Sequence, residues 1–368
     1  FTPGEADQLR RAMGAWRRQG VIEQFRQRFI DGMLGNGYDM DFAERVFRQI
    51  QGFGEYGFPE SHSASFALLA YASAWLKCYH PAAFTASLLN SQPMGFYAPA
   101  QLVIDARKHG VEVRPVDACR SDWDCTLESG PKGKPALRLG FRMVGGLQSE
   151  SVETIIRVRE LRPYESFDDF RSRTQLSSAV LSKLSSADAF ASLDLSRRPA
   201  LWESLPDQQP VPLFDGEEQE ETPEELPGMT ETGQVLADYQ ATGLSLKGHP
   251  LDSIRPQLDN LGIATAASLE HHPADRRVRV AGIVLLRQHP SSARGITFVT
   301  LEDETGQTNL VVHPDVWNRF RTVARTATAL IVRGILQKEA GVIHVVVDHL
   351  QNVSDVIGAG RFPSRDFR

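Results

Sequence analysis

The stretch that decides the fold is QGFGEYGFPESHSASFALLAYASAWLKCYHP, residues 51–81. Its first part is punctuated by Gly52, Gly54 and Gly57. These glycines predict a turn in which the backbone can take left-handed φ angles and approach a ligand closely. Apolar residues then recur at helical spacing until a proline ends the run. The sequence therefore predicts a glycine turn followed by a buried helix, with Ser63 as its N-cap.

Polar and aromatic residues stand just before this helix: Tyr56, Phe58, Ser61, His62 and Ser63. A helix N-terminus carries unpaired N–H groups and a partial positive charge, so a phosphate is a natural ligand there. A tyrosine at this place can stack on a sugar or a base. An ordinary start of a helix, with a core tyrosine and a surface histidine, explains the same residues. Both interpretations stay open at this point.

The block GFGEYGFPESHSASFALLAYASAWLKCYHPAAF, residues 52–84, resembles the fingers segment of bacterial C-family DNA polymerases of the polymerase III alpha type. It is closer still to the error-prone branch of that family, which acts in lesion bypass. In the family this segment contacts the incoming nucleotide, and the resemblance implies that role for Tyr56, Ser61, His62 and Ser63. Replicative members usually have a small polar residue and a lysine where this chain has Pro59 and Glu60. The lost positive charge implies a looser, less selective site.

The composition is that of a soluble globular protein of two or three domains, with 368 residues, 41% hydrophobic and 23% charged. No apolar run approaches the roughly 20 residues of a membrane span, and no signal peptide opens the chain. We therefore expect a cytoplasmic, nucleoid-associated bacterial protein with no membrane partner. Three cysteines predict reduced thiols. The chain starts at Phe1 without a methionine, which suggests the middle of a larger protein.

The net charge of −6 is unevenly distributed. Residues 202–238 hold eleven Asp and Glu and no Lys or Arg, so the rest of the chain carries a net charge of +5. A mildly basic body with an acidic tether suits a nucleic-acid binder. The first 28 residues predict a helix rich in arginine, which suits a DNA phosphate backbone or, alternatively, forms a solvated face. Its candidate DNA contacts are Arg10, Arg11, Arg17 and Arg18.

Asp39 and Asp41 have the spacing at which a strand presents two carboxylates to a metal. A helical pattern follows them, so we interpret Asp41 as an N-cap instead. Cys119 and Cys125 lack a second pair of ligands nearby. The sequence therefore predicts no metal site in this chain.

Residues 137–193 resemble paired helix-hairpin-helix motifs. The first unit, FRMVGGLQSESVETIIRVRE, carries Gly145 and Gly146 between apolar residues, then a helix capped by Ser149. Glycine is needed because such a hairpin brings backbone N–H groups against a DNA phosphate. Arg138, Arg142 and Arg157 are further candidate phosphate contacts. The second unit, LSSAVLSKLSSADAF, lacks glycine at its hairpin and predicts a structural copy.

Residues 199–234 are acidic and rich in proline, which predicts an extended tether. Within it, QPVPLF (residues 209–214) resembles the short peptide with which bacterial polymerases hold the sliding clamp. Leu213 and Phe214 would fill an apolar pocket, and Gln209 would hydrogen-bond its rim. Docking of this peptide on the chain's own body is the alternative.

From residue 276 onward, alternating β-branched segments predict three strands, a helix and two strands, the order of an OB-fold barrel. OB folds bind single strands through a basic groove and stacking aromatic side chains. The candidate contacts are Arg279, Arg287, Phe298 and Arg333. Some of these four alternatively belong to the core or the outer face of the barrel.

Together the segments predict a multidomain α+β protein. Its predicted parts are a mainly helical fingers region (1–117), a tandem helix-hairpin-helix domain (118–198), an acidic linker with a candidate clamp-binding peptide (199–238), an OB-fold domain (239–355) and a tail (356–368).

The resemblance implies the nucleotide- and DNA-binding C-terminal part of an error-prone DNA-directed DNA polymerase, active in translesion synthesis after DNA damage. The family's palm, whose aspartates hold two Mg²⁺ ions, has no counterpart in this sequence, so we expect the chain alone to be inactive. The implied partners are primer–template DNA, a dNTP, the sliding clamp and other lesion-bypass proteins. A non-catalytic helix-hairpin-helix/OB scaffold for DNA repair and an interaction hub acting through the acidic linker are the alternatives.

Overall fold

The computed structural model describes residues 1–14, 23–56, 60–93, 98–205, 226–290, 293, 295–339, 341–355 and 365–367. Within these ranges, the side chains of residues 10–14, 51–56, 60–62, 132 and 365–367 are not described. The chain divides into two compact units, Phe1–Tyr79 and His80–Arg368. Each unit is described below by itself.

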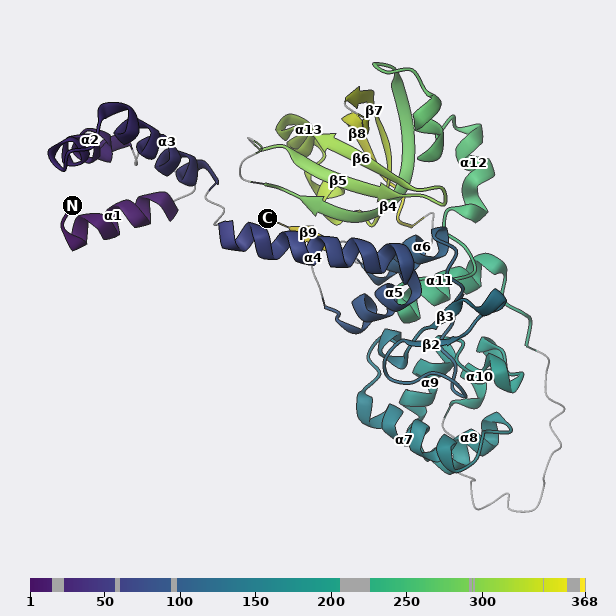
Figure 1. Ribbon diagram of the computed structural model, residues 1–368. Coiled ribbons are helices and arrows are strands. Elements are labelled where there is room, and N and C mark those ends of the chain that lie inside the picture. The colour runs from purple at the N-terminus through teal and green to yellow at the C-terminus, as the bar shows by residue number, and fades with distance from the viewer. Residues whose placement is uncertain are drawn as a thin grey trace, which may run out of the picture. The chain divides into compact units, whose positions relative to one another are not determined.

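The first unit is helical (Figure 1). Its helices are α1 (Pro3–Gly14), α2 (Arg26–Gly35), α3 (Met40–Tyr56) and α4 (Glu60–Tyr79), with a 3₁₀ turn at Glu23–Phe25. Phe47 is 1% exposed and packs against Phe25, Phe29 and Ile50. This small aromatic cluster holds α2 against α3.

Asp39, and not the predicted Asp41, caps α3. The Asp39 carboxylate accepts a hydrogen bond of 2.7 Å from the backbone N–H of Phe42. Asp41 already lies in the first turn of the helix. The prediction was wrong by two residues because both acids precede an apolar run, and sequence spacing alone does not show which one stays outside the helix.

The predicted glycine turn is also wrong in its first part, because α3 continues through Gly52 and Gly54 to Tyr56. A glycine inside a helix costs only about 1 kcal/mol, which the surrounding helical pattern can offset. Gly57 lies outside the described residues. Helix α4 then begins at Glu60, so Ser63 lies in its first turn and is not the N-cap.

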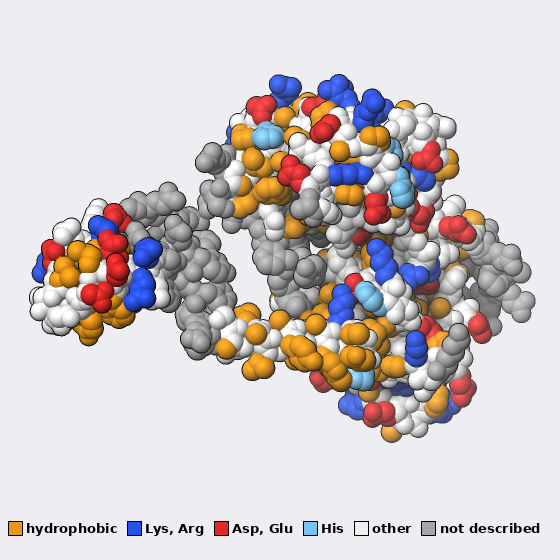
Figure 2. Space-filling model, turned by 45° about the horizontal axis from the view of Figure 1, so that its top comes forward, with side chains coloured by type: hydrophobic (Ala, Val, Ile, Leu, Met, Phe, Trp, Pro, Cys, Tyr) orange, Lys and Arg blue, Asp and Glu red, His pale blue; other side chains and the backbone are white. Residues whose placement is uncertain are grey.

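Helix α4 was predicted to be buried, yet its large apolar side chains are exposed. Leu68 and Tyr71 are each 74% exposed, and Tyr79 is 65% exposed. Figure 2 shows hydrophobic side chains at the surface along this helix. Apolar residues occur on all sides of α4, so burying it would require neighbours on every side. The helix ends at Tyr79 and Pro81 starts the next one, as predicted.

The second unit begins with helices around a three-stranded sheet. The elements are α5 (Pro81–Asn90), α6 (Pro99–Lys108), β1 (Val113–Arg114), β2 (Thr126–Ser129), β3 (Pro135–Arg138), α7 (Ser149–Leu161), α8 (Phe167–Thr174), α9 (Ser178–Ser186), α10 (Arg197–Glu203) and α11 (Glu231–Thr242). Strand β3 lies in the middle, parallel to β1 and antiparallel to β2. One apolar core joins all these parts, and its buried aromatic residues include Phe141, Phe170 and Phe190.

Both ends of the predicted acidic tether are folded. Helix α10 includes residues 199–203, and α11 begins at Glu231, where the Thr230 hydroxyl accepts a capping bond of 3.1 Å from Gly233 N–H. Arg198, on α10, donates a hydrogen bond of 2.6 Å to the carbonyl of Pro227. Residues 206–225, which include the candidate clamp peptide, lie outside the described residues. The segment therefore leaves from and returns to one body.

A closed five-stranded barrel follows, as the OB-fold prediction requires (Figure 1). Its strands are β4 (Arg277–Gln288), β5 (Thr297–Glu302), β6 (Gln307–Val312), β7 (Ala329–Glu339) and β8 (Val342–Asn352), with α13 (Pro314–Arg319) and α14 (Arg321–Thr326) between β6 and β7. The strand order is β5-β6-β8-β7-β4, and pairing of β4 with β5 closes the barrel. Helix α12 (Arg255–Asn260) precedes it, and β9 (Arg365–Phe367) adds to β4. The predicted multidomain α+β architecture is thus confirmed.

Gly334 allows β7 and β8 to approach closely within the barrel. A Cβ atom at this position would lie 2.3 Å from the carbonyl oxygen of Val346, at the point where the strand register shifts. Gly282 serves β4 in the same way, because a Cβ there would lie 2.7 Å from the carbonyl of Glu302. Both strands therefore need glycine to bend around the closed barrel.

Candidate nucleic-acid interface

The four predicted nucleotide contacts lie where α3 ends and α4 begins. Tyr56 is the last residue of α3, and Ser61, His62 and Ser63 follow in the first turn of α4. The side chains of the first three are not described, and Ser63 is exposed. The first turn of this 20-residue helix presents backbone N–H groups and the positive end of the helix dipole. The nucleotide-binding role of these residues stays a prediction.

The basic residues of the first helix are only partly described. Arg10 and Arg11 lie in α1, and their side chains are not described. Arg17 and Arg18 lie outside the described residues altogether. Their predicted contact with DNA therefore stays a prediction.

The first predicted DNA-binding hairpin connects a 3₁₀ turn, Phe141–Met143, to α7. Gly146 is exposed and has a φ of +72°, a conformation that favours glycine. Gln148, and not the predicted Ser149, is the N-cap of α7, which begins at Ser149. Exposed residues 148–150 put the N-terminal N–H groups of α7 next to the hairpin.

Lys183 adds a positive charge to this hairpin, which sequence reasoning missed. Its ammonium group donates a hydrogen bond of 2.5 Å to the carbonyl of Gly146, although the two residues are 37 positions apart. Lys183 lies on α9, in the motif copy that was interpreted as structural. Only the folded chain brings this charge to the first hairpin.

Gly145 and Arg142 make internal contacts. The backbone N–H of Gly145 donates a hydrogen bond of 2.8 Å to the carbonyl of Ala241, at the end of α11. The guanidinium of Arg142 pairs with Asp124 at 2.6 Å and also donates to the carbonyl of Asn90. These groups are occupied within the chain, which leaves Gly146 and the start of α7 as the part of the hairpin that faces outward.

Glu128, on β2, lies between two arginines. Its carboxylate accepts hydrogen bonds from Arg138 at 2.8 and 3.1 Å and from Arg114 at 2.5 Å. Arg138 is 5% exposed, so its predicted contact with a DNA phosphate is corrected to an internal pair with Glu128. Hydrogen bonds from Arg138 lower the pKa of Glu128 from its ordinary value of 4.5 to about 2, with Arg114 contributing in the same direction. The charged form of Glu128, on β2, is thus the one that binds Arg114 of β1 and Arg138 of β3.

We expect Glu128→Gln to destabilise the fold by about 1–3 kcal/mol at neutral pH, since hydrogen bonds to charged groups are lost. Because the folded-state pKa is lowered, this contribution is fully present above pH 4.5 and is lost as the pH falls toward about 2. Urea unfolding of both proteins across this range measures the difference. Glu112 also pairs with Arg114 but is more exposed than Glu128. Glu112→Gln is therefore the control and should change stability less. A difference for Glu128→Gln that stays constant with pH would contradict the prediction.

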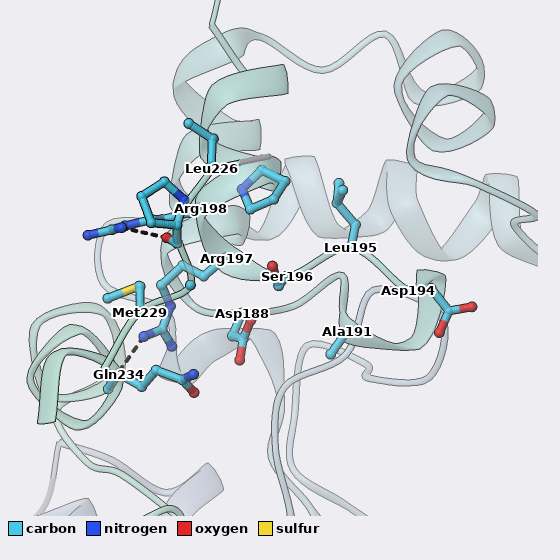
Figure 3. Close-up of a pocket in the computed structure, with 13 residues that line it drawn as sticks. Asp188, Ala191, Asp194, Leu195, Ser196, Arg197, Arg198, Leu226, Met229 and Gln234 are labelled. Atoms are coloured by element: carbon cyan, nitrogen blue, oxygen red, sulfur yellow. Dashed lines mark hydrogen bonds between the residues drawn. The ribbon is translucent and has the colours of Figure 1, made fainter. Parts of the chain in front are cut away.

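The turn that follows α9 in the second motif copy carries an acid, Asp188. Asp188 has a φ of +59° and pairs with Lys247 at 2.7 Å. Asp188 also lines a cavity of about 460 Å³ that extends to Met229 and Gln234 (Figure 3). In Figure 3, Arg197 reaches across this cavity toward Gln234, whose carbonyl accepts a hydrogen bond of 2.9 Å from the guanidinium. A carboxylate at the hairpin would repel a phosphate.

Among the four OB-fold candidates, Arg287 is the one whose side chain is buried. It is 6% exposed and donates hydrogen bonds to the carbonyls of Ala324 and Ala327. Its guanidinium is therefore not available to DNA, and the prediction for this residue is corrected. Sequence alone did not reveal this, because an arginine on a strand can face either side.

The other three OB-fold candidates are accessible. Arg333 pairs with Asp348 at 2.6 Å, and Arg279 donates to the carbonyl of Leu261 at 2.9 Å. Phe298 is 38% exposed on β5. On the same strand pair Thr300 lies opposite Asn309, whose side chain is exposed.

Three families match parts of this chain in order. The bacterial DNA polymerase III alpha subunit finger domain matches residues 1–37, the helix-hairpin-helix motif matches residues 110–200, and the OB-fold nucleic acid binding domain matches residues 278–353. The last two matches coincide with the hairpins and the barrel described above.

Curated relatives match along the entire chain. The "Error-prone DNA polymerase" of Alkalilimnicola ehrlichii is 50% identical over 367 residues, which cover 100% of this chain and 36% of that protein. The protein of the same name from Methylococcus capsulatus is 47% identical over 100% of this chain and 37% of its own length. The one from Rhodopirellula baltica is 50% identical, with coverage of 100% and 33%. This chain belongs to the error-prone branch of the bacterial C-family DNA polymerases.

This C-family chain spans about a third of the length of the curated relatives it matches. The match confirms the family resemblance of the block at residues 52–84. Among solved structures, the asparaginyl-tRNA synthetase of Pyrococcus horikoshii covers 25% of this chain and 22% of its own, with 22% identity and a TM-score of 0.22, which is too low to carry an argument.

The described residues of this C-family chain include no group of three or more His, Cys, Asp or Glu side chains that could hold a metal ion. Within the same residues, no helix combines the length and the apolar character that crossing a membrane requires.

Proposed function

We propose that this chain is the nucleotide- and DNA-binding part of an error-prone DNA-directed DNA polymerase that performs translesion synthesis after DNA damage. The observation that carries the proposal is the match over the whole chain to relatives named error-prone DNA polymerase, with finger, hairpin and OB segments in order. In the intact protein, a primer 3′-OH attacks the α-phosphate of the incoming dNTP. We place the protein in the cytoplasm, on DNA.

The incoming nucleotide is proposed to contact the start of α4. The N–H groups of its first turn and the His62 imidazole would hold the phosphates, and Tyr56 would stack on the sugar or base. Ser61 and Ser63 supply hydroxyl groups in the same turn. Glu60 adds a negative charge there, which weakens the grip on the triphosphate and favours a less selective site.

The metal chemistry is proposed to lie outside this chain. Two Mg²⁺ ions would stabilise the attacking and leaving oxygens of the phosphoryl transfer. The described residues offer no ligand set for such ions, so we assign the ions to carboxylates elsewhere in the full-length protein. We therefore expect the chain alone to bind DNA without extending a primer.

DNA is proposed to contact both the hairpin and the barrel. At the hairpin, Gly146 and the start of α7 present backbone N–H groups beside the Lys183 ammonium, which suits a phosphate of duplex DNA. On the barrel, the exposed Phe298 ring and the face of β5 and β6 suit an unpaired base. Arg279 and Arg333, which lie opposite each other on β4 and β7, are proposed as further phosphate contacts, together with the arginines of α1.

The sliding clamp is the proposed protein partner. Gln209, Leu213 and Phe214 lie outside the described residues, and their pattern supports the proposal. The two described ends of this segment, α10 and the start of α11, belong to the same body. Other lesion-bypass proteins are proposed as additional partners.

Binding of the chain to primer–template DNA at increasing salt concentrations tests the proposal. We expect Lys183→Ala to weaken binding and to reduce the slope of log K against log salt by about 1, the effect of losing one phosphate contact. Lys134→Ala, at an exposed position on the β2–β3 connection, is the matched control and should leave the slope unchanged. Absence of salt-dependent DNA binding in the unaltered chain would overturn the proposed function.

A further inference from the structure

Helix α11 contacts both proposed DNA-binding modules. At its end, the carbonyl of Ala241 accepts the hydrogen bond from Gly145 of the hairpin. Along its length, Leu236 and Tyr239 pack on the apolar cluster that includes Ile331 of the barrel. The helix is therefore part of the contact between the hairpins and the barrel within the second unit.

A polar contact joins the two modules at a second place. The side-chain amide of Gln101, on α6, donates a hydrogen bond to one carboxylate oxygen of Glu302 and accepts one from the amide of Gln307. Nε2 of His249 lies 3.7 Å from the other oxygen of Glu302. We call the three side chains Gln101, Glu302 and Gln307 the barrel joint.

The barrel joint connects a rigid part of each module. Helix α6 belongs to the hairpin side, because Val103 and Ala106 are buried in the same core as α7 and α9. Glu302 ends β5 and Gln307 begins β6, the strand pair whose outer face carries Phe298. The joint therefore lies between the hairpin domain and the strand pair that carries the proposed single-strand surface.

Stability alone does not explain a carboxylate at this place. Glu302 is 4% exposed, and burying a charge costs free energy unless hydrogen bonds compensate. Buried polar contacts restrict the geometry of an interface more than apolar contacts do, because only one arrangement satisfies them. A polar joint between two binding modules therefore points to a role in their relative orientation.

We propose that the barrel joint orients the helix-hairpin-helix domain and the OB barrel so that one DNA molecule with double- and single-stranded parts contacts both. Gln101 is a positioning residue in this arrangement, since it acts through Glu302 and Gln307. Two modules held at a fixed angle bind a matching DNA more tightly than either part, because the second contact forms at a high effective concentration. The inference rests on the proposed function and adds the side chains that fix the orientation of its two DNA-binding modules.

Three DNA probes and three proteins test this inference. The probes are a short duplex, a short oligo-dT strand, and the same duplex carrying that strand as a tail; affinities are measured by fluorescence anisotropy at one salt concentration. The proteins are the full chain, Gln101→Leu, and the double variant Gln101→Glu with Glu302→Gln. The double variant exchanges the carboxylate and the amide, so that position 302 and Gln307 both donate to position 101.

We expect the unaltered chain to bind the tailed duplex at least about tenfold more tightly than either part. Gln101→Leu should lose most of this advantage while its affinities for the two separate parts stay the same, which also shows that it is folded. The double variant should recover the advantage, because its joint is again satisfied.

Three results would overturn the inference: no advantage for the tailed duplex in the unaltered chain, an undiminished advantage in Gln101→Leu, or no recovery in the double variant. If the chain still binds the separate duplex and the separate strand, none of these three results contradicts the proposed function. Failure to bind any of the three probes would instead overturn the proposed function itself.

Discussion

His62→Ala in the full-length protein is expected to lower kcat/KM for nucleotide incorporation by about a hundredfold. The reason is the loss of a side chain beside the N–H groups of α4 that are proposed to hold the triphosphate, and removing one polar group that stabilises a transition state typically costs a factor of about 100–1,000. Tyr56→Ala should have a smaller effect, since stacking on a base or sugar contributes about 1–3 kcal/mol. Single-nucleotide primer extension at varied dNTP concentrations measures both.

His109→Ala provides a matched control for this prediction. His109 is exposed at the end of α6, and its ring bonds to the carbonyl of Asp105 on the same helix. The control should extend primers with unchanged KM and rate. Unchanged kinetics in His62→Ala and Tyr56→Ala would mean that neither side chain contacts the nucleotide.

Arg197→Ala is expected to destabilise the second unit by about 3–5 kcal/mol, the usual effect of breaking a buried ion pair by removing one partner. The Arg197 side chain is 4% exposed, pairs with Asp238, and donates a hydrogen bond of 2.9 Å to the carbonyl of Gln234. Both acceptors lie on α11. Loss of Arg197 should therefore loosen α11 from the hairpins, and urea unfolding of the full chain measures the change.

The neighbouring arginine is the control for this second prediction. Arg198 is exposed and donates one hydrogen bond of 2.6 Å to the carbonyl of Pro227 (Figure 3). Arg198→Ala should change the free energy of unfolding by less than about 1 kcal/mol. Equal losses in the two variants would show that the burial of Arg197 and its pairing with Asp238 do not hold α11.

The barrel could be predicted from sequence because its signal is local. Its strands are rich in β-branched residues, and β6 begins with a regular alternation of exposed and buried positions. Gly282 and Gly334 stand where strands approach most closely. The hairpin glycine Gly146 is similar, since a φ of +72° favours glycine whatever the surroundings. At these positions the local backbone geometry alone requires glycine, so the sequence reveals it.

The first unit was harder to predict because its pattern has two solutions. Gly52 and Gly54 suit a turn, yet the apolar periodicity that starts near Phe42 continues through them and favours helix. The burial of α4 could not be decided from its sequence either. An apolar helix indicates that something should cover it, but not which part of the protein does so.

Side-chain roles at the proposed interface depended on partners far apart in the sequence. Arg287 and Arg142 looked like DNA contacts because arginine commonly serves that purpose, yet their partners are carbonyls and a carboxylate of the chain itself. Lys183 was missed for the opposite reason, since its contact with Gly146 spans 37 positions. Residue type predicts what a side chain can bind, whereas only the fold decides what lies within its reach.

Photochemical cross-linking tests the central claim most directly. The full-length protein, bound to primer–template DNA, would be irradiated with a dNTP that carries a photoreactive group, and the labelled peptide would be mapped. If the start of α4 faces the incoming nucleotide, the label will lie on the peptide that contains residues 56–63. Label found only on other peptides, in a protein that incorporates the same dNTP, would contradict this account.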